Sequence, residues 1–340
     1  MNGQTFRNSR LTLRLSQADI KDELNRRLGR SYDKPKISRW ENDKEPIPDD
    51  VAEVIRNMAG AVQDSARILV LANQKGGVGK TTSSLNLAYA LSSLGGRVLL
   101  IDMDPQATAT AGILAGASVE LYHQGKTTAH LILGGKPLSE IVVAAGTLPD
   151  GRELPFDFIA SHIDLAETDG RREPGFDAAL REAIDPVRED YDWIVIDAPP
   201  NLGMLTWMSL AAADDAIVPV RTEPYDTMGV GLIIGTIGKI QRRLNPGLRL
   251  LGILPTQYNA RKSVDREVLQ HLCSMMKDRA PVLEPVPSSA VYGHAARAGR
   301  IALESSSSAA ATAPYLRLAQ ALQTKTDFPL ADIEQPEGNA

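Results

Sequence analysis

The stretch from Arg67 to Thr82 constrains this chain more than any other. It opens with the apolar run Ile68-Leu69-Val70-Leu71-Ala72, which is typical of a buried strand, and continues into a glycine-rich loop. Glycines let the backbone curl until successive N–H groups face one centre, and a helix that begins at Lys80 adds the positive end of its dipole. The pattern therefore predicts a strand, an anion-binding loop and a helix.

The lysines and threonines of the loop indicate which anion it binds. In the motif G-x-x-x-x-G-K-[ST] the lysine, here Lys80, reaches the β- and γ-phosphates of a nucleotide, and the hydroxyl of Thr81 is a ligand of Mg²⁺. The motif expects Gly where this chain has Gln74, and a second lysine, Lys75, opens the loop. We therefore expect bound ATP and Mg²⁺ as the cofactors.

The segment Lys-Gly-Gly-Val-Gly-Lys-Thr resembles the deviant Walker A loop of the ParA/MinD family of ATPases. The resemblance implies that Lys75 reaches across a dimer interface to the phosphates held by the partner subunit. It also implies a nucleotide-binding set, which is Lys75, Gly76, Gly77, Val78, Gly79, Lys80, Thr81 and Thr82 with the more distant Pro287.

Two later apolar runs each end in acidic residues. Val98-Leu99-Leu100-Ile101 leads to Asp102 and Asp104, and Trp193-Ile194-Val195-Ile196 leads to Asp197. Strands of a parallel sheet deliver such residues to the edge where ligands bind. In the family that the chain resembles, the acid at Asp104 orients or deprotonates the attacking water, and Asp102 is a second candidate on the Mg²⁺ side.

The same family assigns Asp197 to the Walker B position, where it holds a water bound to Mg²⁺. Taken alone, Asp197 could equally be a strand-ending residue that caps a turn. The phosphate loop upstream favours the functional interpretation, and we expect Lys75, Lys80 and Asp104 as the catalytic residues.

Strand-like and helix-like segments alternate along most of the chain. Further strands are expected at 156–160, 216–220 and 250–254, with a helical stretch at 229–244. This order predicts an α/β fold, a doubly wound and mainly parallel sheet of the P-loop NTPase type, preceded by a small all-α domain. The expected division is a helix-turn-helix domain at 1–60, a linker at 61–66, an ATPase domain at 67–325 and a flexible acidic tail at 326–340.

Residues 1–60 carry helix signals and no strand-like alternation. Ser16 can cap a helix that ends at Gly29, a second short helix begins near Pro35, and a third follows Pro48. The first two resemble a helix-turn-helix of the Cro/repressor type, with Ile37 to Glu41 on the recognition helix. This resemblance implies that Lys36, Ser38 and Arg39 enter the DNA groove and that Gln17 contacts the DNA backbone. The alternative is a helical bundle used for dimerisation, in which Trp40 is simply core.

Charge and composition narrow the function classes. The net charge is −5, but residues 1–60 hold 12 Lys and Arg against 10 Asp and Glu, which leaves 25 against 32 for the rest. The 43% hydrophobic content supports a sizeable core. One cysteine, Cys273, excludes a four-cysteine site or cluster within the chain. The chain also lacks the paired cysteines that supply cluster thiolates in the iron protein of nitrogenase. No apolar run is long enough to span a membrane, and we expect a cytoplasmic protein with no membrane partner.

The C-terminal third matches places where the family forms its adenine pocket and its sequence-independent DNA surface. Pro287 falls in the first, and Arg261 matches an arginine that bacterial chromosomal relatives use to bind DNA. The second such arginine is replaced here by Ser288, so Arg297 and Arg300 are the alternatives for that surface. Lone arginines are often merely solvated.

Together the resemblances imply a ParA-type partition ATPase. It would form a homodimer with ATP, bind nucleoid DNA without sequence preference, be stimulated by a ParB-like protein and repress its own operon. Two other functions stay open: a related ATPase that positions a protein cargo, and a transcription regulator with a nucleotide switch.

Overall fold

The protein is described here by a computed structural model. It describes residues 1, 3–13, 15–60, 65–114, 117–148, 151–171, 173–305 and 310–332. Most of the expected linker (61–64) and the end of the expected tail (333–340) lie outside these ranges.

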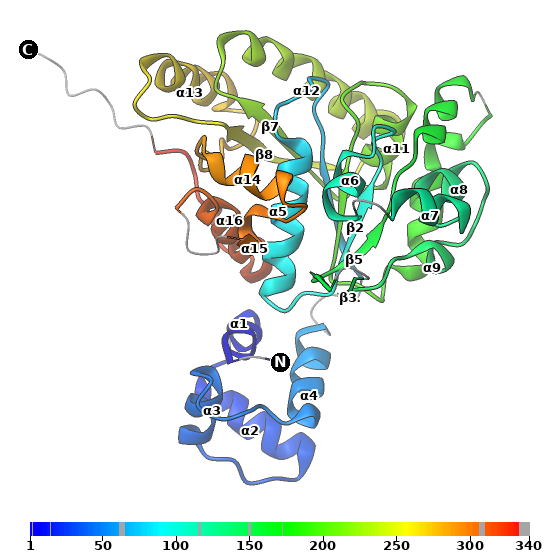
Figure 1. Ribbon diagram of the computed structural model, residues 1–340. Coiled ribbons are helices and arrows are strands. Elements are labelled where there is room, and N and C mark those ends of the chain that lie inside the picture. The colour runs from blue at the N-terminus through cyan, green and yellow to red at the C-terminus, as the bar shows by residue number, and fades with distance from the viewer. Residues whose placement is uncertain are drawn as a thin grey trace, which may run out of the picture.

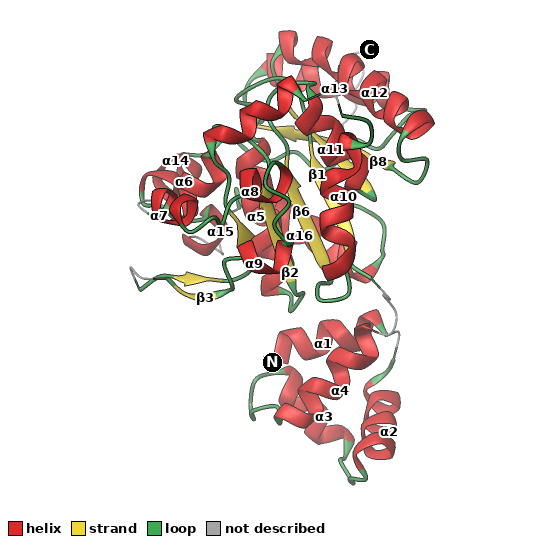
Figure 2. Cartoon of the chain, turned by 90° about the vertical axis from the view of Figure 1, so that its right-hand side faces the viewer, coloured by secondary structure: helices red, strands yellow, loops and turns green. Residues whose placement is uncertain are grey.

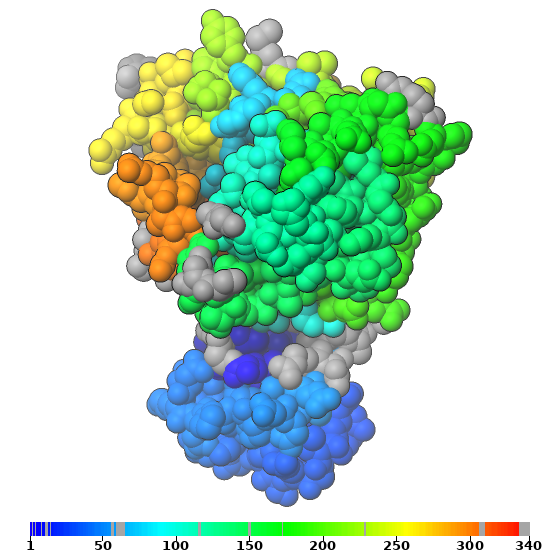
Figure 3. All heavy atoms as spheres, turned by 45° about the vertical axis from the view of Figure 1, so that its right-hand side comes forward, coloured from blue at the N-terminus to red at the C-terminus, as the bar shows by residue number. Residues whose placement is uncertain are grey.

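The N-terminal part is all-α and forms a lobe at one end of the molecule (Figures 1 and 3). Its helices are α1 (Gly3–Thr12), α2 (Gln17–Leu28), α3 (Lys34–Glu41) and α4 (Asp49–Gly60). The last three were expected from the sequence, and α1 was not. Ser16 caps α2 in a capping box with Asp19, and Gly29 ends it in the left-handed conformation at φ 63°.

This lobe has its own small core. Trp40 is fully buried, with edge contacts to Phe6 at 5.8 Å and Tyr32 at 4.9 Å between ring centroids. Ile20, Leu24, Ile37, Val51, Ile55 and Met58 complete the buried cluster. Because α1 supplies Phe6, the core of this lobe depends on a helix that has no motif of its own.

The body of the protein is built on one six-stranded sheet. Its strands are β1 (Arg67–Leu71), β2 (Val98–Asp102), β5 (Asp157–Ile159), β6 (Trp193–Asp197), β7 (Asp215–Arg221) and β8 (Arg249–Thr256), in the order β5-β2-β6-β1-β7-β8. Every pairing in this sheet is parallel. The strands β3 (Gly146–Thr147) and β4 (Glu153–Leu154) form a separate antiparallel pair. The expected doubly wound fold is confirmed.

Helices cover both faces of the sheet (Figure 2). Alternate residues of β1 serve the two faces: Ile68 and Val70 pack into one hydrophobic core, and Leu69 and Leu71 into the other. The first core is completed by α8 (Thr128–Ile132), α9 (Leu138–Ile141), α10 (Ala179–Ile184), α11 (Met204–Ala212), α12 (Pro224–Arg243) and α13 (Ser263–Met276). The second is completed by α5 (Lys80–Ser93), α6 (Thr108–Leu114), α7 (Ser118–His123), α15 (Ala302–Ser305) and α16 (Ala313–Thr324).

The remaining elements are short. They are α14 (Ala290–Arg297) and the 3₁₀ helices η1 (Ile163–Gly170), η2 (Phe176–Ala178) and η3 (Asp185–Val187). Residues 329–331, which the sequence assigned to a flexible tail, are tied to the body: the Glu284 amide donates to the Pro329 carbonyl at 2.8 Å, and the Ala331 amide to the Val282 carbonyl at 3.0 Å. Backbone hydrogen bonds thus connect the first part of the expected tail to the body.

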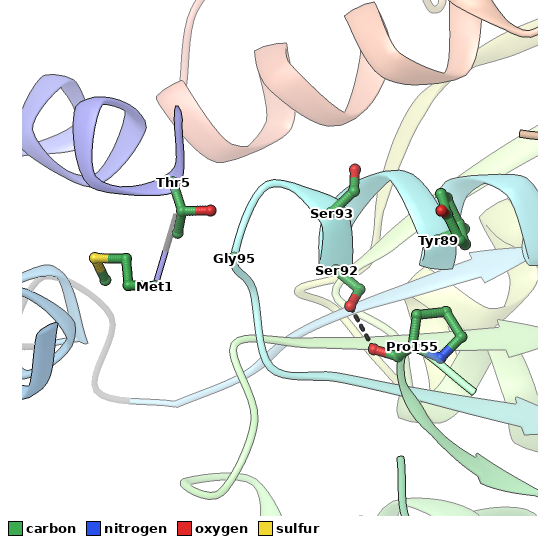
Figure 4. A pocket seen from close by; sticks show the side chains of 7 residues that line it. All are labelled: Met1, Thr5, Tyr89, Ser92, Ser93, Gly95 and Pro155. Carbon is green, nitrogen blue, oxygen red and sulfur yellow. Dashed lines mark hydrogen bonds between the residues drawn. The ribbon is translucent and has the colours of Figure 1, made fainter. Parts of the chain in front are cut away.

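The N-terminal lobe approaches the body where α1 lies beside the end of α5 (Figure 4). Gly95 adopts φ +93°, and a Cβ there would lie 2.1 Å from the Thr5 methyl carbon, so only glycine allows this approach. A solvent-open cavity of about 380 Å³ lies at this contact and is lined by residues of both parts, among them Met1, Thr5, Tyr89 and Pro155.

Candidate active site

The phosphate loop joins β1 to α5 as expected. Gly77 (φ 72°) and Gly79 (φ 84°) both adopt the left-handed conformation that side chains disfavour, which explains the glycines at these two positions. Gly79 is the N-cap residue of α5. The loop therefore lies at the positive end of a helix dipole, where anions bind.

Lys80 lies inside this loop. Its side chain is buried, and the ammonium donates a hydrogen bond to the Lys75 carbonyl at 3.0 Å. Burial lowers the pKa of Lys80, while the carboxylates of Asp197 and Asp104 act in the opposite direction. The structure thus places Lys80 within the electrostatic influence of two of the three acids that the sequence singled out, Asp104 and Asp197.

Asp197 ends β6 and is fully buried. Its Oδ1 accepts a hydrogen bond from the Ser84 hydroxyl at 2.9 Å, whereas its Oδ2 has no partner among the described residues. Burial raises the pKa of Asp197 to about 6, although the hydroxyls of Thr81 and Ser84 pull it down. An unpartnered carboxylate oxygen near a threonine hydroxyl is a hard oxygen donor set, and these two residues therefore fit a Mg²⁺ ion.

Asp102 and Asp104 flank this position with different roles. Asp102 accepts hydrogen bonds from the Thr110 amide at 3.0 Å, the Thr110 hydroxyl at 2.7 Å and the Asp104 amide at 3.1 Å. Both of its oxygens are therefore already used within the protein, which argues against the Mg²⁺-side role considered for Asp102. Asp104 remains 7% exposed, and its Oδ1 accepts from the Gln106 amide at 2.9 Å.

Two residues to which the sequence analysis gave no individual role, at the end of β8 and directly after it, hold the loop. The Thr256 hydroxyl donates to the Val78 carbonyl, and the Gln257 side-chain amide donates to the Gly77 carbonyl, each at 2.8 Å. Gln257 adopts a left-handed conformation at φ 55°, which is rare for a residue with a side chain. A polar side chain at the end of a strand carries no signal of its own, because its partner is a carbonyl about 180 residues away in the chain.

A cavity of about 210 Å³ lies beside the phosphate loop, and both Gly79 and Pro287 line it. The structure therefore brings Pro287 next to the phosphate loop, as the expected adenine-side position requires. The other residues that line this cavity are Thr82, Thr256, Gln257, Val286, Ser288, Ser289, Tyr292 and Tyr315.

Lys75 has an intramolecular partner that the sequence did not indicate. Its ammonium forms an ion pair with Asp226 in the first turn of α12. The carboxylate of Asp226 also accepts a hydrogen bond from Arg221 Nε at 2.8 Å. Asp226 carries no motif signal, since an acid in the first turn of a helix is common in any protein.

Three of the four residues expected to contact DNA in the N-terminal lobe have side-chain partners in the structure. Lys36 and Arg39 both form ion pairs with Glu45, the latter at 2.6 Å. The side-chain amide of Gln17 donates a hydrogen bond to the Glu41 carboxylate at 2.7 Å. Ser38 lies on α3 between the two basic residues and is half-buried. The structure thus groups Lys36, Ser38 and Arg39 on one short helix.

The expected DNA surface of the body is less concentrated. Arg261 precedes α13, Arg297 ends α14 and Arg300 follows it, and all three are exposed. Within the described ranges, none of the three side chains forms an ion pair. Among the described residues, no helix is both long enough and apolar enough to cross a membrane.

Comparisons with known proteins match the body of the chain. A family model described as an AAA domain matches residues 66–250, which include Lys75, Lys80, Asp104, Asp197 and Asp226. The chromosome-partitioning ATPase Soj of Thermus thermophilus is 42% identical over 205 residues, covering 59% of this chain and 74% of that protein. The chromosome partitioning protein ParA of Caulobacter vibrioides is 34% identical over 260 residues, covering 75% of this chain and 92% of that protein.

A solved structure has the same fold. It is the cobyrinic acid a,c-diamide synthase of Mycobacterium smegmatis with a bound ATP analog and magnesium, and it superposes with a TM-score of 0.65 and 31% sequence identity. The superposition covers 78% of this chain and 99% of that one.

Proposed function

The chain belongs to the ParA family of P-loop ATPases, and on that premise we propose that it is a DNA-partition ATPase that hydrolyses ATP to ADP and phosphate with Mg²⁺. One observation carries the chemical part of this proposal. The buried ammonium of Lys80 lies within the electrostatic influence of Asp104 and Asp197, and Oδ2 of Asp197 has no partner among the described residues. Positioning and charge neutralisation are the main requirements for phosphoryl transfer, and this arrangement meets both.

Each residue has a distinct part in the reaction. The loop amides and Lys80 bind the phosphates, and the hydroxyl of Thr81 with Asp197 would hold Mg²⁺. An ion held by these two residues would supply positive charge against the phosphates. Asp104, which keeps a small exposed surface, orients the attacking water or accepts its proton.

Dimerisation would complete the site. Lys75 stands at the start of the loop, and its side chain is 36% exposed. In the proposed homodimer it contacts the phosphates held by the partner subunit, so that each site is complete only when two ATP-bound subunits meet. The dimer would also present a symmetric surface to DNA.

DNA binding would use two surfaces. Arg261, Arg297 and Arg300 are exposed cations suited to phosphate contacts that do not depend on sequence, which would keep the protein on the nucleoid. Helix α3 would read an operator through Lys36, Ser38 and Arg39, so that the protein represses its own operon. A ParB-like partner would stimulate hydrolysis and release the dimer from DNA.

The test is ATP turnover with and without random-sequence duplex DNA and the ParB-like protein encoded nearby. We expect slow basal turnover that both additions stimulate, and loss of turnover in Lys75→Ala and Asp104→Ala. A wild-type protein that shows neither ATP-dependent DNA binding nor stimulation would contradict the partition function and favour a nucleotide-switched regulator. Stimulation by a protein cargo but not by the ParB-like protein would favour the cargo-positioning alternative.

A further inference from the structure

The lysine expected to act on a second subunit is held within its own. The ammonium of Lys75 is paired with Oδ1 of Asp226, whose side chain is only 1% exposed. The loop is tied to the same helix a second time, because the Gln74 side-chain amide donates to the Gly229 carbonyl at 3.4 Å. Helix α12 therefore holds the opening of the phosphate loop at two points.

Asp226 is in turn held by a second cation. Arg221, at the end of β7, donates from Nε to Oδ2 at 2.8 Å, and its guanidinium also lies 3.3 Å from Glu223. Burial acts to raise the pKa of Asp226, but the bonds from Arg221 and Lys75 outweigh it and leave the pKa below its ordinary value. The carboxylate is thus charged, with one oxygen for each cation.

We propose that Asp226 is the positioning residue of Lys75: it holds the lysine in the single subunit and releases it to the phosphates of the partner's nucleotide when two subunits associate. This inference rests on the proposed function, in which Lys75 acts across the dimer. The ion pair then sets how much ATP is needed before the subunits pair, because every association must first break it.

The surroundings of the pair make that exchange reversible. A buried carboxylate left without a partner is strongly unfavourable, but Arg221 stays on Oδ2 after Lys75 leaves. The next residues of the loop, Gly76 and Gly77, have open space where a Cβ would stand, so no packed side chain crowds Lys75 from that direction. Lys75 itself is already partly exposed.

The experiment follows dimer formation of the full-length chain by sedimentation velocity as a slowly hydrolysed ATP analogue is added with Mg²⁺. Asp226→Asn keeps the shape of the side chain and removes its charge, so we expect half-maximal dimer at an analogue concentration lower by about three- to tenfold. Arg221→Gln should shift it the other way, because the departure of Lys75 would then leave Asp226 unpaired. Glu223→Gln is the matched control, since Glu223 touches Arg221 but not Lys75.

The opposite signs separate this device from simple damage to the fold, which would weaken association in both variants. The inference is overturned if Asp226→Asn, with a thermal unfolding midpoint like that of wild type, needs as much analogue as wild type or more. If Asp226→Asn does not fold, Arg221→Gln decides the question. An unchanged or lower analogue concentration at half-maximal dimer in Arg221→Gln would then overturn the inference. The variant Lys75→Ala tests the role of Lys75 across the dimer separately from the positioning role of Asp226. If Lys75→Ala dimerises as wild type does, the proposed role of Lys75 fails, and this inference fails with it.

Discussion

Asp102 and Asp197 stand directly opposite each other at the carboxyl ends of the neighbouring strands β2 and β6. Both side chains are fully buried. Burial and the nearby charge of Asp197 raise the pKa of Asp102 to about 8, although the bonds from Thr110 and Asp104 pull it down. Ionising both of these buried neighbouring carboxylates is unfavourable, so we expect the two acids to have different roles. Asp102 accepts hydrogen bonds from the Thr110 and Asp104 backbone amides, whereas Oδ2 of Asp197 has no partner among the described residues and is the oxygen that we propose for Mg²⁺.

The first prediction concerns the pH dependence of stability. The pKa of Asp102 is raised in the folded state, so its contribution to stability is fully present below about pH 4 and is lost as the pH rises towards 8. Asp197 adds to this loss between about pH 4 and 6. We expect the free energy of unfolding, measured with urea in the absence of nucleotide, to fall across this range in the wild type.

Asp102→Asn should reduce the slope of that fall, whatever its effect on absolute stability, because the amide cannot ionise. Glu140→Gln, which changes an exposed acid on α9, is the control and should keep the wild-type slope. Equal slopes in all three proteins would show that the buried pair does not titrate as described.

The second prediction concerns Ser84, which orients Asp197. Ser84→Ala removes the hydrogen bond to Oδ1 and leaves Oδ2 in place. Residues that orient a metal ligand typically contribute about 10- to 100-fold to metal affinity or activity. We expect ATP turnover of Ser84→Ala to need at least about tenfold more Mg²⁺ for half-maximal rate. Ser93→Ala, whose hydroxyl bonds only the Ala90 carbonyl on the same helix, should match wild type. An unchanged Mg²⁺ requirement would contradict the role of Ser84 in orienting Asp197.

The third prediction concerns the bond from Thr256 to the phosphate loop. Thr256→Val keeps the shape of the side chain but leaves the Val78 carbonyl without its donor. An unsatisfied buried carbonyl costs about 1–3 kcal/mol, and we expect the free energy of unfolding to fall by that amount. Affinity for ATP, measured by calorimetry, should fall as well, since Val78 belongs to the loop that binds phosphates. Thr147→Val, on the exposed strand β3, should change neither quantity.

The fourth prediction concerns DNA binding by helix α3. Glu45 neutralises both Lys36 and Arg39, so Glu45→Gln should free two cations and raise affinity for a duplex from upstream of the gene. Arg39→Ala should lower it. Both effects should weaken as salt is added, in a fluorescence anisotropy titration of the full-length chain without nucleotide.

Glu53→Gln, a charge change on the exposed side of α4, is the matched control for Glu45→Gln. If neither Glu45→Gln nor Arg39→Ala alters DNA affinity, the N-terminal lobe does not read DNA through α3. A helical bundle used for dimerisation would then be the better interpretation.

The sequence predicted the parts of this protein that are continuous in the chain. The phosphate loop is one segment, and Asp104 and Asp197 each follow a recognisable buried strand, so their meeting at one sheet edge could be expected. The capping signals at Ser16 and Gly29 likewise gave the bounds of α2 correctly. In each case the signal and its physical cause lie within a few residues of each other.

What the sequence did not predict depends on tertiary contacts. Ser84 is one more polar residue on a helix until the fold places it on Asp197, and Asp226 reaches Lys75 over a separation of 151 residues. Thr256 and Gln257 act on backbone carbonyls, which have no residue identity to recognise. Asp102 was expected near the metal because it ends a strand, but the amide and hydroxyl of Thr110 occupy it instead.

The most direct test of the shared active site is ATP turnover, in the presence of DNA and the ParB-like protein, by an equal mixture of Lys75→Ala and Asp104→Ala subunits combined before ATP is added. In a mixed dimer, the Lys75→Ala subunit keeps its own Asp104 and receives Lys75 from its partner, so one of the two sites is complete. Random pairing would make half of the dimers mixed, so the mixture should recover activity up to about a quarter of the wild-type rate, although each variant alone is inactive. A mixture as inactive as its components would contradict the action of Lys75 across the dimer.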